Sequence, residues 1–402
     1  MFKFSFDLDD TTDDPELGVS LDQLTEPVNE QNGTSEADVP AEEPCKEILM
    51  QDLLNALPSL ISCSPLTIPL RDGEKSITLN RRDLFDARFQ LISEGTGPDD
   101  VGSDDMGSDA LGESNVFEGE TKEHRHASAL KFIDAPSDLV PRIYEGGLKT
   151  WECSIDLVEY LDSIKGLKGL CGKDVLELGC GTAVPSLYIL CDLFFNPPPS
   201  DTTQLPETII YLQDYNDSVL ELVTLPNILL TWYLSPASLS YRTSRTTSPE
   251  PETDDLPPFP STPEPFELPI TPALKSAFLT SLKEAYNITI RFFSGSWSSF
   301  TAQLPILHSK AFNLVLTSET IYRTDSLPSL VDTMRLACLP RSADDDAIKG
   351  ECLVAAKVLY FGVGGGVSDF VDFVESNGDA KARVVKERKT GVGRVILSLD
   401  FS

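Results

Sequence analysis

The sequence has few histidines and no paired cysteine motif. Its three histidines show no HxxxH or HExxH spacing, and none of its eight cysteines belongs to a CxxC pair. Structural zinc sites are built from such pairs, so we expect no metal site. The cysteines lie mostly in apolar surroundings, which is typical of reduced thiols in a protein core.

Basic residues and long apolar runs are also scarce. Lysine and arginine total 32 against 64 acidic residues, a net charge of −32 at pH 7. This excess disfavours binding to nucleic-acid phosphates or to an anionic membrane, and it favours a basic partner. No run of about 18 apolar residues occurs and the N-terminus MFKFSFDLDD does not resemble a signal peptide, so a soluble intracellular protein is expected.

Composition divides the chain into four parts. Residues 1–44 hold 13 acids and one base, Lys3, and we expect a disordered acidic tail. Residues 45–93 predict a helix and a hairpin, too small to hold a core alone and therefore an appendage docked on the main domain. Residues 94–125, rich in Gly, Ser and Asp, predict a disordered acidic linker. The main domain is expected to span 126–402.

The main domain alternates strand-like and helix-like segments, which predicts a parallel sheet with helices on both faces. The expected strands lie near 174–178, 208–213, 288–293, 312–317 and 352–360. Two extended C-terminal runs around a Gly-Val-Gly turn predict an antiparallel hairpin. The expected fold is therefore the α/β, Rossmann-like, seven-stranded sheet of class I methyltransferases. Residues 236–272 hold ten of the 29 prolines and predict a disordered insertion.

The candidate site lies where the parallel strands end, because open α/β sheets bind ligands at that edge. The first strand runs into the turn Gly179-Cys180-Gly181, which lets the backbone approach a ligand, although such turns are often structural. Asp214 ends the second strand, where its carboxylate can accept ribose hydroxyls or cap the next helix. A dinucleotide site requires a small residue at Val184, whereas an S-adenosyl ligand does not.

Other segments add to this pocket. Gly295 and Trp297 follow the third strand, where they could flank an adenine ring, although Trp297 could equally be a core indole. The run Tyr360-Phe361-Gly362-Val363-Gly364-Gly365-Gly366 lacks the Lys-Ser/Thr of a phosphate-binding loop, and we interpret it as a tight turn over the cleft.

Five strings in order resemble the histidine protein methyltransferase family from about Leu130 to the C-terminus: EGGLKTWECSIDLVEYL, DVLELGCGTAVPSL, LQDYNDSVLELVTLPN, LVLTSETIYR and KVLYFGVGGGVSDF. The segment NRRDLFDARFQLISE is similar to the part of that family before its acidic linker. The resemblance implies methylation, by S-adenosylmethionine, of one histidine ring nitrogen in a large-subunit ribosomal protein, with cytoplasmic and nuclear residence.

The resemblance also implies roles for single residues. The cofactor residues are Trp151, Glu152, Glu177, Gly179, Cys180, Gly181, Asp214, Gly295 and Trp297. In this scheme the glycine turn and Glu177 hold the amino-acid portion, and Trp151 with Glu152 holds the carboxylate or the mouth of the site. Glu319 and Tyr322 would face the acceptor as catalytic residues; the alternative is a helix cap and a rim aromatic.

Two other functions stay open from the sequence. Glu319-x-x-Tyr322 resembles the acidic-x-x-Tyr motif that protein lysine methyltransferases carry after the fourth strand, and a lysine acceptor must first lose its proton. A methyltransferase fold retained as a binding module is the other alternative. We expect a monomer that binds a basic protein, without direct contact to nucleic acid or membrane.

Overall fold

The computed structural model describes residues 43–95, 146–164, 170–196, 205–246, 264–340, 350–360, 365–378 and 380–401. The predicted tail 1–44 and linker 94–125 lie almost entirely outside the described residues.

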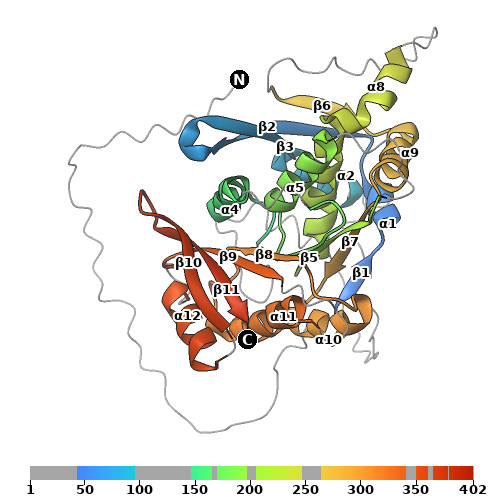
Figure 1. Cartoon of the computed structure of the whole chain (residues 1–402). Helices are drawn as coiled ribbons and strands as arrows, with labels where there is room; N and C mark the ends of the chain where they lie inside the picture. Colours follow the sequence, from blue (N-terminus) through green and yellow to red (C-terminus); the bar gives the residue numbers. More distant parts are fainter. Residues whose placement is uncertain are drawn as a thin grey trace, which may run out of the picture. The chain divides into compact units, whose positions relative to one another are not determined.

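The main sheet has eight strands in the order β1-β7-β5-β4-β8-β9-β11-β10 (Figure 1). Their bounds are β1 (Lys46–Ile48), β4 (Asp174–Leu178), β5 (Thr208–Asp214), β7 (Ile288–Ser294), β8 (Leu314–Ser318), β9 (Glu351–Lys357), β10 (Ala380–Arg388) and β11 (Arg394–Phe401). Strands β7, β5, β4, β8 and β9 are parallel and match the predicted strands to within three residues. β11 pairs antiparallel with both β9 and β10, which confirms the C-terminal hairpin and the class I fold.

The N-terminal part is more closely joined to the main domain than we predicted. The expected helix and hairpin are present as α1 (Met50–Ala56), β2 (Leu60–Leu70) and β3 (Lys75–Arg82), followed by α2 (Leu84–Gly95). However, β1 pairs antiparallel with β7, and so becomes the eighth strand of the main sheet. β2 also pairs on its second edge with β6 (Phe266–Pro269), which forms a three-stranded sheet. Strand pairs between residues so far apart in the chain leave no local signal in the sequence.

The insertion 236–272 is ordered at both ends, unlike the prediction for the whole segment. A 3₁₀ turn (Pro236–Ser238) leads into α8 (Leu239–Thr246), and β6 precedes α9 (Pro272–Thr280). Tyr241 of α8 packs on Trp232 with ring centroids 6.1 Å apart, and Leu268 of β6 is fully buried. These apolar contacts order the ends of the segment, whereas 247–263 lies outside the described residues.

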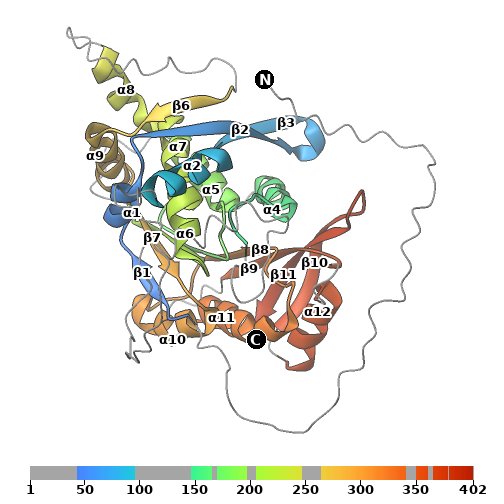
Figure 2. The same ribbon diagram turned by 180° about the vertical axis from the view of Figure 1, so that it is seen from behind.

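Helices cover both faces of the main sheet (Figures 1 and 2). One face carries α4 (Glu152–Ser163), α5 (Val184–Phe195), α6 (Asp217–Val219) and α7 (Leu225–Tyr233), with the three-stranded sheet outside them; the other carries α10 (Trp297–Leu307), α11 (Leu327–Cys338) and α12 (Val367–Ser376). Short 3₁₀-helical turns are formed by Arg71–Gly73 and Thr324–Ser326, and short π-helical segments by Leu220–Thr224 and Ser281–Ala285.

Successive side chains of a strand in the main sheet point into two different apolar cores, one on each face. Val175 of β4 belongs to the core beneath α4, α5 and α7, whereas Leu176 and Leu178 belong to the core beneath α10, α11 and α12. Strands buried on both faces are continuously apolar, which is why the sequence located them well. Within the described residues no single helix is long and apolar enough to cross a membrane; one pair, Asp217–Tyr233 with Pro236–Ser244, passes that test together but is bent by 76°.

Candidate functional site

The glycine turn after β4 requires its glycines. Gly179 and Gly181 have φ values of +59° and +51°, the left-handed region that favours glycine. A Cβ atom on Gly179 would lie 2.7 Å from Cγ2 of Thr320, and one on Gly181 would lie 3.1 Å from the backbone oxygen of Gly147. Between them, the amide of Cys180 donates to the carbonyl of Gln213 at 2.9 Å. The turn is therefore tightly packed and ends directly at α5.

The loop before α4 closes on this turn. Gly147 has φ of +106° and packs closely against Val219 and Asp214. A Cβ atom on this glycine would lie 3.0 Å from Val219 and 3.4 Å from Oδ2 of Asp214. The hydroxyls of Thr150 and Thr182 are 2.9 Å apart. The loop thus places the predicted residues Trp151 and Glu152, at the start of α4, beside the carboxyl ends of the strands.

Two polar residues that we had not singled out hold the same turn. The Thr224 hydroxyl donates a hydrogen bond to the carbonyl of Gly181 at 2.7 Å, and the Asn227 side chain donates one to the carbonyl of Thr182 at 3.1 Å. In turn, the backbone amide of Arg82 on β3 donates to Oδ1 of Asn227 at 2.8 Å. The TLPN string that contains both residues was the available signal.

Asp214 lies where the sequence placed it, at the end of β5, but its carboxylate already has protein partners. Oδ2 accepts the amide of Gly181 at 2.9 Å and Oδ1 accepts the amide of Asn216 at 3.1 Å. Burial raises the pKa of this carboxyl to about 6, although these backbone donors oppose the shift. Asp214 therefore stabilises the glycine turn, and its contact with ribose stays a prediction.

Glu177 is likewise occupied by the protein. The side chain is buried, and Oε2 accepts hydrogen bonds from the amide of Ser186, at 3.0 Å, and from its hydroxyl. Burial raises the pKa of Glu177 to about 8, and the charge of Asp214 adds to the increase. This carboxyl joins β4 to the first turn of α5, and its contact with the amino-acid portion of the cofactor stays a prediction.

Gln213 connects the second and third strand ends. Its side chain is fully buried, accepts the indole N–H of Trp297 at 2.9 Å and donates to the carbonyl of Gly295 at 2.8 Å. Trp297 is therefore held beside the glycine turn, with Cζ2 3.9 Å from the position of a Cβ atom on Gly179. From the sequence we singled out Trp297 and Gly295, the two partners of this glutamine, but not Gln213 itself.

The N-terminal segment covers the turn at Gly295 through backbone atoms. A Cβ atom on Gly295 would lie 2.4 Å from the carbonyl oxygen of Pro44. The carbonyl of Glu43 accepts the amide of Ser296 at 3.0 Å, and the carbonyl of Cys45 accepts the side-chain amide of Gln303 at 3.0 Å.

Glu319, which we predicted to face the methyl acceptor, follows β8 and has an unusual backbone conformation. It has φ of +59°, and its amide donates to the carbonyl of Ala355 at 2.9 Å. Its side chain is 8% exposed, and the Cys153 thiol and the Tyr360 hydroxyl are the hydrogen-bond donors beside its carboxylate. The next residue, Thr320, packs against the glycine turn at Gly179, so Glu319 lies next to that turn.

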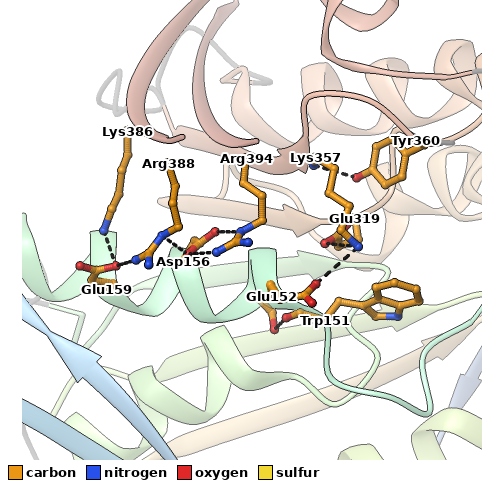
Figure 3. Close-up of polar contacts among 11 residues, drawn as sticks. Trp151, Glu152, Asp156, Glu159, Glu319, Lys357, Tyr360, Lys386, Arg388 and Arg394 are labelled. Atoms are coloured by element: carbon orange, nitrogen blue, oxygen red, sulfur yellow. Dashed lines mark hydrogen bonds and ion pairs between the residues drawn. The ribbon is translucent and has the colours of Figure 1, made fainter. Parts of the chain in front are cut away.

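Lys357, at the end of β9, lies between two carboxylates (Figure 3). Its ammonium nitrogen is 3.5 Å from Oε1 of Glu319, 3.4 Å from Oε2 of Glu152 and 4.2 Å from the centroid of the Trp151 ring. The sequence reasoning brought Trp151, Glu152 and Glu319 to this site but missed the lysine, whose string KVLYFGVGGG was quoted only for its glycines.

A thiol and a phenol complete the surroundings of Glu319. Burial, followed by the negative charge of Glu319, raises the pKa of both Cys153 and Tyr360. Tyr322 is buried, 7% exposed, and its ring lies edge-on to Tyr360 with centroids 6.4 Å apart; its role at the acceptor stays a prediction. Gly365 packs on the Tyr322 backbone, where a Cβ atom would lie 2.4 Å from its carbonyl oxygen. The predicted tight turn at residues 361–364 lies outside the described residues.

Proteins of similar sequence identify the family. Histidine protein methyltransferase 1 of Schizosaccharomyces pombe is 34% identical over 273 residues, which cover 67% of this chain and 68% of that protein. Histidine protein methyltransferase 1 of Saccharomyces cerevisiae is 30% identical over 302 residues, covering 74% of this chain and 68% of that protein. The chain belongs to the histidine protein methyltransferase family. A Bos taurus homolog of the same family is 32% identical, covering 67% of this chain and 59% of that protein.

Other comparisons add little. No protein-family model matches the chain. Magnesium protoporphyrin IX methyltransferase from Synechocystis PCC 6803, solved with bound SAH, aligns with a TM-score of 0.31 at 10% identity, covering 62% of this chain and 83% of that one. The assignment therefore depends on the strand order and on the relatives in the histidine protein methyltransferase family.

Membership of this family confirms that the chain is a methyltransferase and that S-adenosylmethionine is its methyl donor. The site fits such a ligand, because the left-handed glycine turn opens beside the start of α5 and no phosphate-binding residue follows it. The glycine turn, Trp297 and Trp151 stay the predicted residues for holding the donor, and of these two tryptophans Trp297 lies next to the turn at Gly179.

Proposed function

We propose that this enzyme methylates a histidine ring nitrogen in a large-subunit ribosomal protein, acting as a monomer in the cytoplasm and the nucleus. The observation that carries the proposal is the position of the Glu319 carboxylate, which is 8% exposed and lies next to the glycine turn. An ionised carboxylate offers about four lone-pair sites, so it can accept the N–H group of a neutral imidazole in addition to its protein partners.

The methyl transfer requires mainly that the acceptor nitrogen is held in line with the methyl group. S-adenosylmethionine supplies an electrophilic methyl group, and a neutral imidazole of pKa about 6.5 is a competent nucleophile at neutral pH. The lone pair of one ring nitrogen forms the new C–N bond while the methyl–sulfur bond breaks, and its electron pair stays on sulfur. Glu319 would accept the N–H of the other ring nitrogen, so that only one nitrogen faces the methyl group and the positive charge that develops on the ring is stabilised.

Histidine fits this site better than lysine. The ammonium of Lys357 already lies 3.5 Å from Glu319 and 3.4 Å from Glu152. A lysine acceptor would place a second cation beside the first and would have to lose its proton there, whereas a neutral imidazole adds no charge. The acidic character of the chain, −32 at pH 7, favours encounter with a basic ribosomal protein rather than with nucleic acid.

The test is to incubate the purified enzyme with methyl-labelled S-adenosylmethionine and ribosomal proteins from cells that lack it, and then to hydrolyse the protein and identify the labelled amino acid. We expect methylhistidine in one large-subunit protein, with one ring isomer in excess. The matched control is the Gly179→Val variant, whose larger side chain meets Thr320. Label in methyl-lysine would establish the alternative acceptor, and label in a protein outside the large subunit would contradict the proposed substrate.

A further inference from the structure

Lys357 has a position that its role as a strand residue does not require. It ends β9 with its side chain only 15% exposed, and its ammonium lies over the face of Trp151, 4.2 Å from the ring centroid. Stacking on an indole stabilises a cation and fixes its place. From there the ammonium reaches Oε1 of Glu319, at 3.5 Å, and Oε2 of Glu152, at 3.4 Å.

The Glu319 carboxylate is held in a confined place beside Lys357. Its side chain is 8% exposed and its backbone is in the left-handed region, where a residue other than glycine costs free energy. The other groups that face it from α4 and from the end of β9 are the Glu152 carboxylate, the Cys153 thiol and the Tyr360 hydroxyl, and none of these is positive. The ammonium of Lys357 is therefore the cation that this buried carboxylate meets, and a charge in a buried place is stable when it is paired.

Arg394 on β11 does not replace the lysine. Its charge acts on Glu152 and Cys153, but its guanidinium is paired with Asp156, to which Nη2 donates at 3.3 Å. Figure 3 shows this pair, along with the pairs of Arg388 and Lys386, as a separate row beside the Lys357 group.

We propose that Lys357 is a positioning residue for the methyl transfer: its ammonium holds the Glu319 carboxylate at the place where that carboxylate accepts the N–H of the acceptor imidazole. The inference rests on the proposed function for the identity of the acceptor, but not for the pairing itself. The distance of 3.5 Å is longer than a normal hydrogen bond, so the ammonium neutralises the carboxylate without using up its acceptor capacity.

Two measurements on the full chain test this role separately. The first is the coupling between Lys357 and Glu319 in urea unfolding, from the single variants Lys357→Met and Glu319→Gln and the double variant. The second is kcat, with the ratio of the two ring isomers, for methylhistidine formation in ribosomal protein. Lys357→Met and Lys357→Gln remove the charge, and Lys357→Arg retains it. Lys386→Met is the matched control, because Lys386 also pairs with a carboxylate of α4, Glu159, at 2.7 Å, outside this site.

We expect the unfolding effects of Lys357→Met and Glu319→Gln to be non-additive, because each variant removes the same pair. In both neutral variants kcat and the excess of one ring isomer should fall, whereas Lys357→Arg and Lys386→Met should keep the wild-type values. Full additivity, or the wild-type kcat and isomer ratio in both neutral variants, would overturn the inference. Non-additive unfolding together with no methylhistidine from the wild type would support the pairing and overturn the proposed acceptor.

Discussion

The amide of Gly181 donates a hydrogen bond of 2.9 Å to Oδ2 of Asp214, so the end of the second parallel strand braces the turn that follows the first. A second bond from the amide of Asn216 fixes the other oxygen of the same carboxylate. The shape of the cofactor turn thus depends on a side chain from the neighbouring strand.

Replacement of Asp214 by alanine should weaken cofactor binding. Loss of a charged hydrogen bond costs about 1.5–3 kcal/mol, or roughly 10- to 150-fold in affinity for S-adenosylmethionine, measured by calorimetry. Asp332→Ala on α11, where the side chain is 58% exposed, should bind as the wild type does. Equal affinity in the two variants would mean that the turn holds its shape without Asp214.

Glu319→Gln should lower turnover or reduce the preference for one ring nitrogen, because the amide is neutral and presents a donor as well as an acceptor. The affinity for S-adenosylmethionine should not change, since Glu319 belongs to the acceptor side. The measurement is kcat with separation of the two methylhistidine isomers, next to a cofactor titration. Wild-type turnover and isomer ratio in this variant would remove Glu319 from the mechanism.

Gly179→Ala should disrupt the cofactor turn. The new Cβ atom would lie 2.7 Å from Cγ2 of Thr320, and alanine in the left-handed region costs about 1–2 kcal/mol more. Combining it with Thr320→Ser removes the obstructing methyl group and should restore part of the cofactor affinity. The four proteins of this double-mutant cycle separate the two costs: full additivity would show that the contact with Thr320 plays no part.

The raised pKa of Glu177 gives a pH dependence of stability. Burial raises this pKa to about 8 in the folded chain, so between about pH 4.5 and pH 8 the folded state binds more protons than the unfolded state. The free energy of unfolding should therefore fall as pH rises through this window, by at most about 1.4 kcal/mol per pH unit from this group. In Glu177→Gln this contribution is absent, so the variant should gain stability relative to the wild type as pH rises. Urea unfolding at several pH values checks it, and parallel curves for the two proteins would contradict it.

The sequence located the strands and the glycine turn because their signals are local. Apolar runs such as 352–356 are continuous when both faces of a strand are buried, and Gly179 and Gly181 directly after a strand mark a turn that a ligand can approach, although that pattern alone is weak. Asp214 could be found for the same reason, as the acidic residue that ends the next strand.

Contacts between distant segments could not be predicted in this way. The pairing of β1 with β7 and of β2 with β6 joins residues that share no local pattern. The approach of Lys357 to Glu319, and the bond from Trp297 to Gln213, depend on how neighbouring strands end in space. The acids Asp214 and Glu177 were named correctly as part of the site region, but the protein donors that bind them became visible only with the fold.

The strip of chain at Glu43 and Cys45 contacts the turn at Gly295 through carbonyl oxygens, which every amino acid carries. These two contacts would therefore survive a change of side chain, for example at the exposed Glu43. Removal of the strip, in contrast, would take away the acceptors of the Ser296 amide, which precedes α10, and of the Gln303 side chain. A segment can thus be needed for its shape alone, and its importance is revealed by deletion rather than by substitution.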